Sequence, residues 1–385
     1  MHAEPSLSEI NHTPSEEQNE GLLKSFQNKL RAQGFSYDKR FIVNFKKSEH
    51  ILFQKEKAFH NVQPVLQSGH GGRVKDVDGN TFIDVCLGCG GVTFGHGYDF
   101  SESEHGPLTL ASTAISSRFA TSNEWLCTST LEVVTGMKCV GYARSSDCAV
   151  NIVAAIFSKA VVFDVFSDDA KTIEEARALS HASQENGQAF VINEAVSAGR
   201  FAYPSITHQH RILASGIILG PGLANGYPFY PVCVDPEYWG NASMLMDSLT
   251  PFLILPSVTS ELMFATAIRA MEYFGKHFVV FNIQRYYKAF RSGLTSGIVA
   301  NKLQDKVFLE EKSGQILVKL TKLSFEKEEE EFRAIISAGL IGRGVYVEKD
   351  KLAFSPCFAT TIELVVQVTL AFKATLGDYV ESLGL

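Results

Sequence analysis

The sequence is poor in charge, in tryptophan and in long apolar runs. Charged residues make up 20% of the 385 residues, and only 2 are Trp. The apolar fraction of 45% is that of an ordinary globular protein, which excludes a disordered chain, a collagen-like chain and a coiled coil. No run reaches the roughly 18 consecutive apolar residues of a membrane span, so we expect no membrane partner.

Positive charge is also in deficit. The chain carries 35 Lys and Arg against 42 Asp and Glu, which gives a net charge of -7 at pH 7. A mildly acidic protein lacks the basic surface with which nucleic acids and anionic lipids are bound. We therefore expect no nucleic acid among its partners.

Disulfide and zinc-site patterns are missing as well. The seven cysteines are an odd number, and the first 40 residues hold no apolar stretch long enough for a secretory leader. We expect free thiols in a reducing, cytoplasmic compartment. Cys86 and Cys89 form a lone C-x-x-C motif, but no second pair follows at zinc-site spacing, so the sequence predicts no metal site.

Phenylalanine is in surplus, with 28 Phe against 12 Tyr, and predicts a large core. The length allows two or three domains. Through the middle of the chain, helical patterns alternate with short apolar strands, as in an α/β layer with a mostly parallel sheet. The expected strands are 160–166, 189–193 and 215–220, and the expected helices are 148–159 and 173–186.

The two ends of the chain have other patterns. Residues 72–84 alternate around an Asp78-Gly79-Asn80 turn, which predicts a hairpin. Towards the C-terminus we expect helices over 260–274 and on to 303, strands 316–320 and 345–348, and helices 326–338 and 361–376, with Gly339 ending the helix before it. The predicted parts are a flexible arm (1–18), an N-terminal small-domain segment (19–107) with a helix over 17–33, a large α/β domain (108–256), connecting helices (257–305) and a C-terminal small domain (306–385).

Three blocks, in order along the chain, resemble class III aminotransferases, and among these the glutamate-1-semialdehyde aminomutase branch. They are residues 76–84 followed by Gly95-His96, then Glu194-Ala-Val-Ser197 with Arg200, then Gly220 with Gly226-Tyr-Pro228. The resemblance implies the aminotransferase fold type I, with a mostly parallel sheet in a large domain and a small α+β domain made from both chain ends. It also implies a dimer and a pyridoxal phosphate cofactor.

Two positions that the resemblance assigns to the cofactor have changed. The family's lysine forms a Schiff base with pyridoxal phosphate, which only an amine can do. Pro221 stands at this place, and no lysine occurs between Lys171 and Lys276. The family's aspartate, which keeps the pyridine nitrogen protonated, is replaced by Asn193, which has a similar shape but no charge.

The segment that resembles the family's phosphate-binding cup is altered too. It reads Arg144-Ser145-Ser146-Asp147-Cys148, in which the carboxylate of Asp147 would repel a phosphate dianion. Arg144 could neutralise Asp147 or hold a different anion. The alternative is ordinary helix capping, with Ser145 or Ser146 as the N-cap and Asp147 in the first turn.

Two further departures concern the cofactor ring and the partner subunit. The stretch 150–192 is far shorter than in the family and lacks its aromatic-His-Gly turn, and Pro256 stands where the resemblance implies a threonine of the partner. We therefore expect a shortened large domain, loss of pyridoxal phosphate, no cofactor and no ordinary aminotransferase activity.

A few polar residues remain around the altered site. Glu194, Cys148 and His96 are the candidate catalytic residues: a carboxyl in an apolar pocket, a thiol at a helix N-terminus and a histidine of the family pattern. The alternatives are an internal ion pair or hydrogen bond for Glu194, a small packed residue for Cys148 and a structural histidine for His96. The candidate substrate-binding residues are Arg144, Arg200 and Asn193.

Three functions stay open. The first is a cofactor-independent enzyme that reuses the cleft for acid–base or nucleophilic chemistry on a small carboxylated or carbonyl metabolite of a specialised biosynthetic pathway. The second is a non-catalytic pseudoenzyme that pairs with an active aminotransferase or pathway enzyme and stabilises or regulates it; the Phe count and the apolar segment 251–258 favour such an interface. The third is a lysine-free enzyme that depends on pyridoxamine phosphate. We expect a homodimer, with a heteromer with an active paralogue as the alternative.

Overall fold

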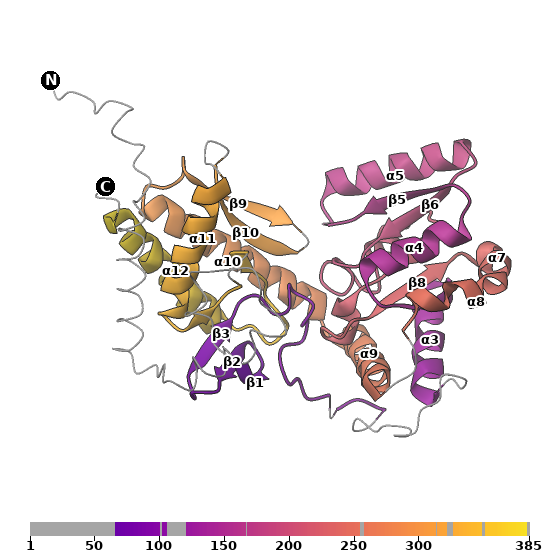
Figure 1. Cartoon of the computed structure of the whole chain (residues 1–385), viewed down its shortest axis with the longest axis horizontal. Coiled ribbons are helices and arrows are strands. Elements are labelled where there is room, and N and C mark those ends of the chain that lie inside the picture. The colour runs from indigo at the N-terminus through magenta and orange to yellow at the C-terminus, as the bar shows by residue number, and fades with distance from the viewer. Residues whose placement is uncertain are drawn as a thin grey trace.

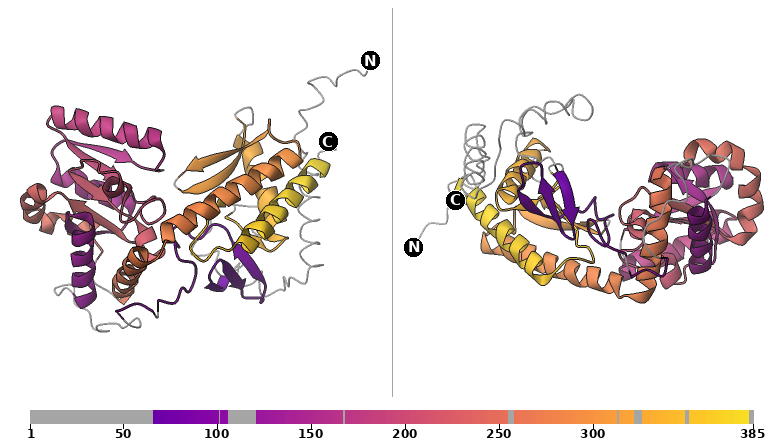
Figure 2. Two further views of the ribbon diagram at one scale, coloured as in Figure 1. Left: turned by 180° about the vertical axis from the view of Figure 1, so that it is seen from behind. Right: turned by 90° about the horizontal axis from the view of Figure 1, so that it is seen from below.

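The computed structural model describes residues 66–100, 102–105, 121–166, 168–254, 258–312, 314–321, 326–348 and 351–382. They form two lobes joined by helices α9 (Val258–Lys276) and α10 (Val279–Ala300) (Figure 1). Figure 2 shows the same two lobes from behind and from below. The predicted arm (1–18), the predicted helix over 17–33 and Pro256 lie outside the described residues.

The first lobe is built on a five-stranded sheet with the order β4-β8-β7-β6-β5. Its strands are β4 (Lys138–Ala143), β5 (Ala160–Asp164), β6 (Ala189–Asn193), β7 (Gly216–Ile218) and β8 (Tyr230–Val234). β5, β6 and β7 are parallel, and β8 is antiparallel to both of its neighbours. Because four strands share one direction, the mostly parallel sheet predicted from the sequence is confirmed.

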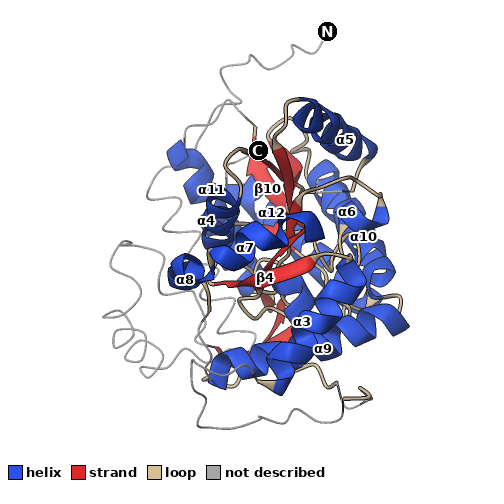
Figure 3. Cartoon of the chain, turned by 90° about the vertical axis from the view of Figure 1, so that its right-hand side faces the viewer, coloured by secondary structure: helices blue, strands red, loops and turns tan. Residues whose placement is uncertain are grey.

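Strand β6 shows how the sheet is covered on both faces. Phe190 and Ile192 pack in a core shared with α3 (Ser122–Thr135), α5 (Ala170–Glu185) and α9. Val191, between them, packs instead with α4 (Ser146–Ile156), α7 (Trp239–Met244) and α8 (Met246–Leu249). Figure 3 shows α4 and α7 on one side of the strands and α3 and α9 on the other. A strand covered on both faces is a continuous apolar run, as it is here.

The second lobe joins both ends of the described chain. Strands β1 (Leu66–His70), β2 (Arg73–Asp76) and β3 (Thr81–Asp84) are antiparallel, and β11 (Val345–Tyr346) adds to β3 in parallel. A second sheet, β12-β10-β9, contains β9 (Val307–Lys312), β10 (Gln315–Leu320) and β12 (Ala353–Phe354). Its core is shared with α10, α11 (Glu326–Ile341) and α12 (Ile362–Ser382). A small α+β part made from both chain ends is therefore confirmed.

Local signals predicted some boundaries well and others poorly. The hairpin is present, and Asp76 closes its turn by accepting the N–H groups of Asp78 and Asn80 at 3.0 and 2.8 Å. Gly339 does not end α11, which continues to Ile341. Leu340 and Ile341 are buried, and their burial outweighs the roughly 1 kcal/mol that glycine costs inside a helix.

Part of the phenylalanine surplus forms one aromatic cluster. The ring of Phe94 lies 5.0–6.2 Å from five other rings, measured between centroids. These rings belong to Tyr98, Phe100, Tyr273, Phe274 and Phe358. Because most of the pairs are edge-to-face, the arrangement that aromatic quadrupoles prefer, the cluster holds the loop after β3 against α9 and the loop before α12.

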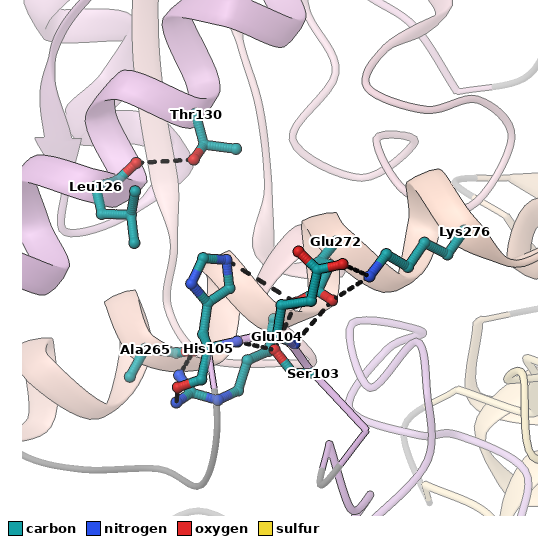
Figure 4. A network of polar contacts seen from close by, with 9 residues as sticks. Ser103, Glu104, His105, Leu126, Thr130, Ala265, Glu272 and Lys276 are labelled. Carbon is teal, nitrogen blue, oxygen red and sulfur yellow. Dashed lines mark hydrogen bonds and ion pairs between the residues drawn. The ribbon is translucent and has the colours of Figure 1, made fainter.

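A polar network ties residues 102–105 to α9 (Figure 4). Glu272 accepts hydrogen bonds from Ser103 Oγ at 2.5 Å, from Glu104 N at 3.0 Å and from Lys276 Nζ at 2.8 Å. Burial by itself would raise the pKa of Glu272, but the hydrogen bonds from Lys276, Ser103 and Glu104 outweigh burial and lower the pKa to about 2. Lys276 also donates to Glu104 at 2.6 Å, so the network closes on itself.

Two sequence expectations concern the chain as a whole. Among the described residues, no helix combines the length and the hydropathy that crossing a bilayer requires. All seven cysteines are described, and each is a free thiol.

Candidate functional site

The carboxyl ends of β5, β6 and β7 meet at one edge of the sheet, where open α/β sheets bind their ligands. Asp164 ends β5, Asn193 ends β6, and Pro221 follows β7. Asn193 Nδ2 donates to Asp164 Oδ1 at 2.8 Å and lies 3.5 Å from Ser146 Oγ. Asn193 Oδ1 accepts the N–H of Ala195 at 3.1 Å. The amide of Asn193 is therefore held by the protein on both sides.

The N-terminus of α4 lies beside Asn193. Ser145 is the N-cap, and its Oγ accepts the N–H of Cys148 at 3.2 Å. Asp147 lies in the first turn, and Cys148 is half-buried. Arg144 is exposed, and its Nε donates to the carbonyl of Leu253 at 2.9 Å. This is the helix-capping arrangement that the sequence offered as the alternative to a phosphate cup.

Glu194 points away from solvent. It is 0% exposed and accepts hydrogen bonds from Ile206 N at 2.5 Å, Thr207 N at 2.8 Å and Thr207 Oγ1 at 2.5 Å. The pKa of Glu194 is raised, because the effect of burial outweighs the lowering effect of these hydrogen bonds. The carboxyl thus satisfies the first N–H groups of α6 (Ile206–Gln209), which matches the internal hydrogen-bond alternative.

His96 lies in the second lobe, in the loop after β3. Its Nε2 lies 2.7 Å from Asp84 Oδ2, and its side chain is 25% exposed. The other oxygen of Asp84 accepts the N–H groups of Cys86 and Leu87 at 2.9 and 3.0 Å. The Asp84–His96 pair therefore anchors the first residues of the segment 86–91, which we call the glycine-rich loop.

Four successive residues of the glycine-rich loop are left-handed. Leu87, Gly88, Cys89 and Gly90 have φ values of 50°, 59°, 54° and 80°. For a non-glycine residue this conformation costs roughly 1–2 kcal/mol, and such strain is concentrated at functional sites. A Cβ at Gly90 would lie 1.1 Å from Arg200 Nη1, so a larger residue fits there only if the guanidinium of Arg200 moves.

Arg200 supports this loop from behind. It is 3% exposed, and its two terminal nitrogens donate to the carbonyls of Gly314 at 2.7 Å and Cys89 at 3.4 Å. Burial lowers the pKa of Arg200 to about 10, which leaves it charged at neutral pH. The guanidinium thus joins the loop to the β9–β10 turn through backbone carbonyls.

The glycine-rich loop lies next to Glu348, a side chain that the sequence did not connect with the C-x-x-C motif of Cys86 and Cys89. Cys89 Sγ lies 3.6 Å from Glu348 Oε2 and 4.0 Å from Oε1. Cys86 completes a cluster in which the ligand atoms of all three residues lie within 4.8 Å of one another. Glu348 is placed by the parallel pairing of β11 with β3, in which Tyr346 lies opposite Asp84. Asp164 and Glu348 are the carboxylates that the sequence reasoning missed.

The glycine-rich loop and the sheet edge face each other. A Cβ built at Gly91 would lie 3.6 Å from Pro221 Cβ, in van der Waals contact. Tyr230, at the start of β8, has a pKa that is raised first by burial and then by the charges of Asp147 and Cys89. Charges from both the sheet edge and the glycine-rich loop therefore add to the effect of burial on the pKa of Tyr230.

Comparison with known proteins supports this architecture at the level of fold. No protein-family model and no curated protein sequence matches the chain. The FumI protein of Sphingopyxis sp. aligns with a TM-score of 0.68 at 12% identity, over 89% of this chain and 97% of that one. The adenosylmethionine-8-amino-7-oxononanoate aminotransferase of Methanocaldococcus jannaschii aligns with a TM-score of 0.67 at 14% identity, over 88% and 99%.

A glutamate-1-semialdehyde aminomutase of Pseudomonas aeruginosa aligns over 95% of this chain and 100% of its own, with a TM-score of 0.62 at 14% identity. At these identities the similarity is one of fold. The chain therefore has the mixed α/β fold-type-I architecture that class III pyridoxal phosphate aminotransferases share.

Proposed function

We propose that the chain is an enzyme that does not use pyridoxal phosphate and works in the cleft of the aminotransferase fold on a small carboxylated or carbonyl metabolite. The observation that carries the proposal is Pro221. It opens the 3-10 helix η3 (Pro221–Ala224), which follows β7 after Leu219 and Gly220, and it faces Gly91 of the glycine-rich loop. A covalently held pyridoxal phosphate needs an amine at this place, and proline has none.

The neighbouring groups also fit the cofactor poorly. The carboxylate of Asp147 occupies the first turn of α4, where a phosphate would need donors. Ser145 Oγ already accepts the N–H of Cys148, and Asn193 already bonds Asp164. Because these groups already bond neighbouring protein atoms, they are not available to hold the phosphate or the ring of the cofactor.

Three groups can supply the new chemistry. His96 has Nε2 held by Asp84, which fixes its ring and leaves Nδ1 to move a proton. Cys148 offers a half-buried thiol as a nucleophile. Glu194 is enclosed by its donors, so we propose that it positions α6. Arg144, which is exposed at the sheet edge, is the proposed contact for a substrate carboxylate. Asn193 is already held on both sides by protein groups and is not proposed as a contact.

The test is a titration of the purified chain with pyridoxal phosphate, followed by borohydride reduction and mass spectrometry. We expect no cofactor absorption band and no stoichiometric phosphopyridoxyl adduct, whereas the Pseudomonas aminomutase treated in parallel serves as the positive control. One adduct per chain on a single lysine would contradict the proposal. Binding of pyridoxamine phosphate without a lysine adduct would favour the lysine-free alternative instead.

A second candidate, a non-catalytic pseudoenzyme that pairs with and stabilises or regulates an active aminotransferase or pathway enzyme, is favoured by the surface of α3. Trp125 is 67% exposed and Val133 is 83% exposed on this helix. Aromatic side chains are enriched in subunit interfaces, and we propose that Trp125 and its surroundings on α3 contact a partner subunit. We expect the chain to be a dimer by light scattering and the double variant Trp125→Glu, Val133→Glu to be a monomer, with Val299→Glu on α10 as the control. A monomeric wild-type chain would remove this support.

A further inference from the structure

We infer that Cys86, Cys89 and Glu348 bind a zinc-type divalent metal ion at the glycine-rich loop. The sequence predicted no metal site, because the C-x-x-C motif lacks a second pair. The third ligand comes instead from the strand that pairs with β3. This site does not depend on the proposed function, since it uses none of Pro221, Asp147 and Asn193.

The spacing of the ligand atoms suits a tetrahedral ion. Zinc lies about 2.3 Å from cysteine sulfur and about 2.0–2.2 Å from carboxylate oxygen, so adjacent sulfur and oxygen ligands are about 3.5 Å apart. Cys89 Sγ and Glu348 Oε2 are 3.6 Å apart. All three ligand atoms lie within 4.8 Å of one another, so small rotations of the side chains complete the set. Two thiolates with one carboxylate favour zinc over magnesium or calcium.

The backbone around the site holds the ligands in place. Asp84 Oδ1 accepts the N–H groups of Cys86 and Leu87, and the left-handed turn 87–90 brings residue 89 back beside residue 86. Arg200 holds the carbonyl of Cys89. Because these supports come from β3, the loop and a buried arginine, the ligands are positioned before any ion binds.

The exposure of the ligands indicates the class of site. Cys86 is buried, Glu348 is half-buried and Cys89 is exposed. An ion held by them would have protein on one side and an open fourth position on the other. Three protein ligands with an open position are the pattern of catalytic zinc, whereas structural zinc has four protein ligands. The fourth position would take water or another oxygen ligand.

The experiment uses the full chain, reduced, stripped with a chelator and reloaded with Co²⁺ as a spectroscopic substitute for zinc. We expect one ion per chain, a sulfur-to-cobalt charge-transfer band and the strong visible bands of tetrahedral cobalt. Zn²⁺ should displace the cobalt and protect Cys89 from alkylation. The absence of the charge-transfer band in the wild-type chain would overturn the site.

Four variants identify the ligands. Cys89→Ser should abolish the part of the charge-transfer band that comes from the sulfur of Cys89. Glu348→Gln should weaken zinc binding by at least about tenfold, because even the loss of a group that only supports a ligand costs about that much. The controls Cys148→Ser and Glu330→Gln, which replace a half-buried thiol and an exposed carboxylate elsewhere, should bind as the wild type does. Circular dichroism confirms that each variant is folded. Equal binding by Cys89→Ser and the wild type would overturn the assignment.

A disulfide is the other chemistry open to the two thiols. It is tested by counting alkylatable thiols in protein purified without reductant. Two thiols missing at Cys86 and Cys89, together with no metal uptake after reduction, would assign the pair to thiol–disulfide exchange and overturn the metal site. These readouts involve no pyridoxal phosphate, so their failure is distinct from failure of the proposed function.

Discussion

The sheet edge and the glycine-rich loop use their polar groups in opposite ways. At the sheet edge, Ser145, Asn193 and Glu194 are hydrogen-bonded to neighbouring groups that complete a helix end or a strand end. At the glycine-rich loop, Cys89 and Glu348 meet each other, while backbone carbonyls and amides are held from behind by Arg200 and Asp84. The first side builds the scaffold, whereas the second leaves ligand atoms converging on one point.

The contrast is sharpest between two glutamates. Glu194 has no exposed surface and accepts several hydrogen bonds from the start of α6. Glu348 is half-buried, and its oxygens lie next to a thiol. Residue type alone therefore does not mark a catalytic carboxylate; what matters is whether its lone pairs are already used.

The largest expected effect is from Glu194→Ala. This change leaves the N–H groups of Ile206 and Thr207 buried without an acceptor, and each such group costs about 1–3 kcal/mol. We expect a loss of about 3 kcal/mol or more in the free energy of unfolding, measured by urea denaturation. Glu185→Ala, at an exposed position near the end of α5, is the control and should change little. Equal stability of the two variants would contradict a scaffold role for Glu194.

A smaller, pH-dependent effect is expected from Glu272→Gln. Like Glu194, Glu272 accepts several hydrogen bonds, but its pKa is lowered whereas that of Glu194 is raised. Hydrogen bonds from Lys276, Ser103 and Glu104 outweigh burial and lower the pKa of Glu272 to about 2. A carboxylate with a lowered pKa stabilises the fold at pH values above its unfolded pKa, near 4.5, and this stabilisation is lost as the pH falls towards 2.

The denaturation midpoints of the wild type and Glu272→Gln should therefore differ by a constant amount at neutral pH and converge as the pH falls below 4.5. Glu175→Gln, an exposed carboxylate on α5, should show no such convergence. A gap that persists unchanged at pH 3 would show that the charge of Glu272 does not provide the stabilisation.

The sequence predicts those features of the fold that depend on interactions between residues close together in the chain. The hairpin around Asp78-Gly79-Asn80 and the bounds of β6 were predicted because a turn motif and an apolar run are local signals. Helix capping by Ser145 is also a local signal, and it was one of the two interpretations of this segment, beside an altered phosphate-binding cup. The predicted end of α11 at Gly339 was wrong, because the true end depends on the burial of Leu340 and Ile341 against elements distant in the sequence.

The candidate site was predicted less completely. The position of Asp164 beside Asn193 could have been predicted, since the two residues end neighbouring parallel strands and lie opposite each other in the pair β5–β6. The contact between Glu348 and Cys89 could not have been predicted, because it depends on the pairing of β11 with β3 and joins residues 259 positions apart. A lone C-x-x-C motif does not reveal a third ligand from so distant a strand.

The glycine-rich loop is next in expected effect and is tested with two glycines. Gly90→Ala would place a Cβ 1.1 Å from Arg200 Nη1, whereas Gly136→Ala meets nothing within 4 Å, and both glycines have positive φ. Both variants carry the left-handed strain, but overpacking adds about 1–3 kcal/mol at Gly90 alone. We expect Gly90→Ala to be the less stable in thermal denaturation. If the two variants are equally stable, Arg200 does not hold the loop.

The smallest expected effect is from Ser145→Ala at the sheet edge. The change removes the side-chain acceptor of the Cys148 N–H and should cost about 1 kcal/mol, the usual value of an N-cap. Ser122→Ala, in the first turn of α3 where Thr121 is the cap, is the matched control and should cost less. Urea denaturation of both variants measures the difference. A Ser145→Ala variant as stable as the wild type would indicate that Ser145 is available for a ligand, and the contrast between the sheet edge and the glycine-rich loop would then fail at this residue.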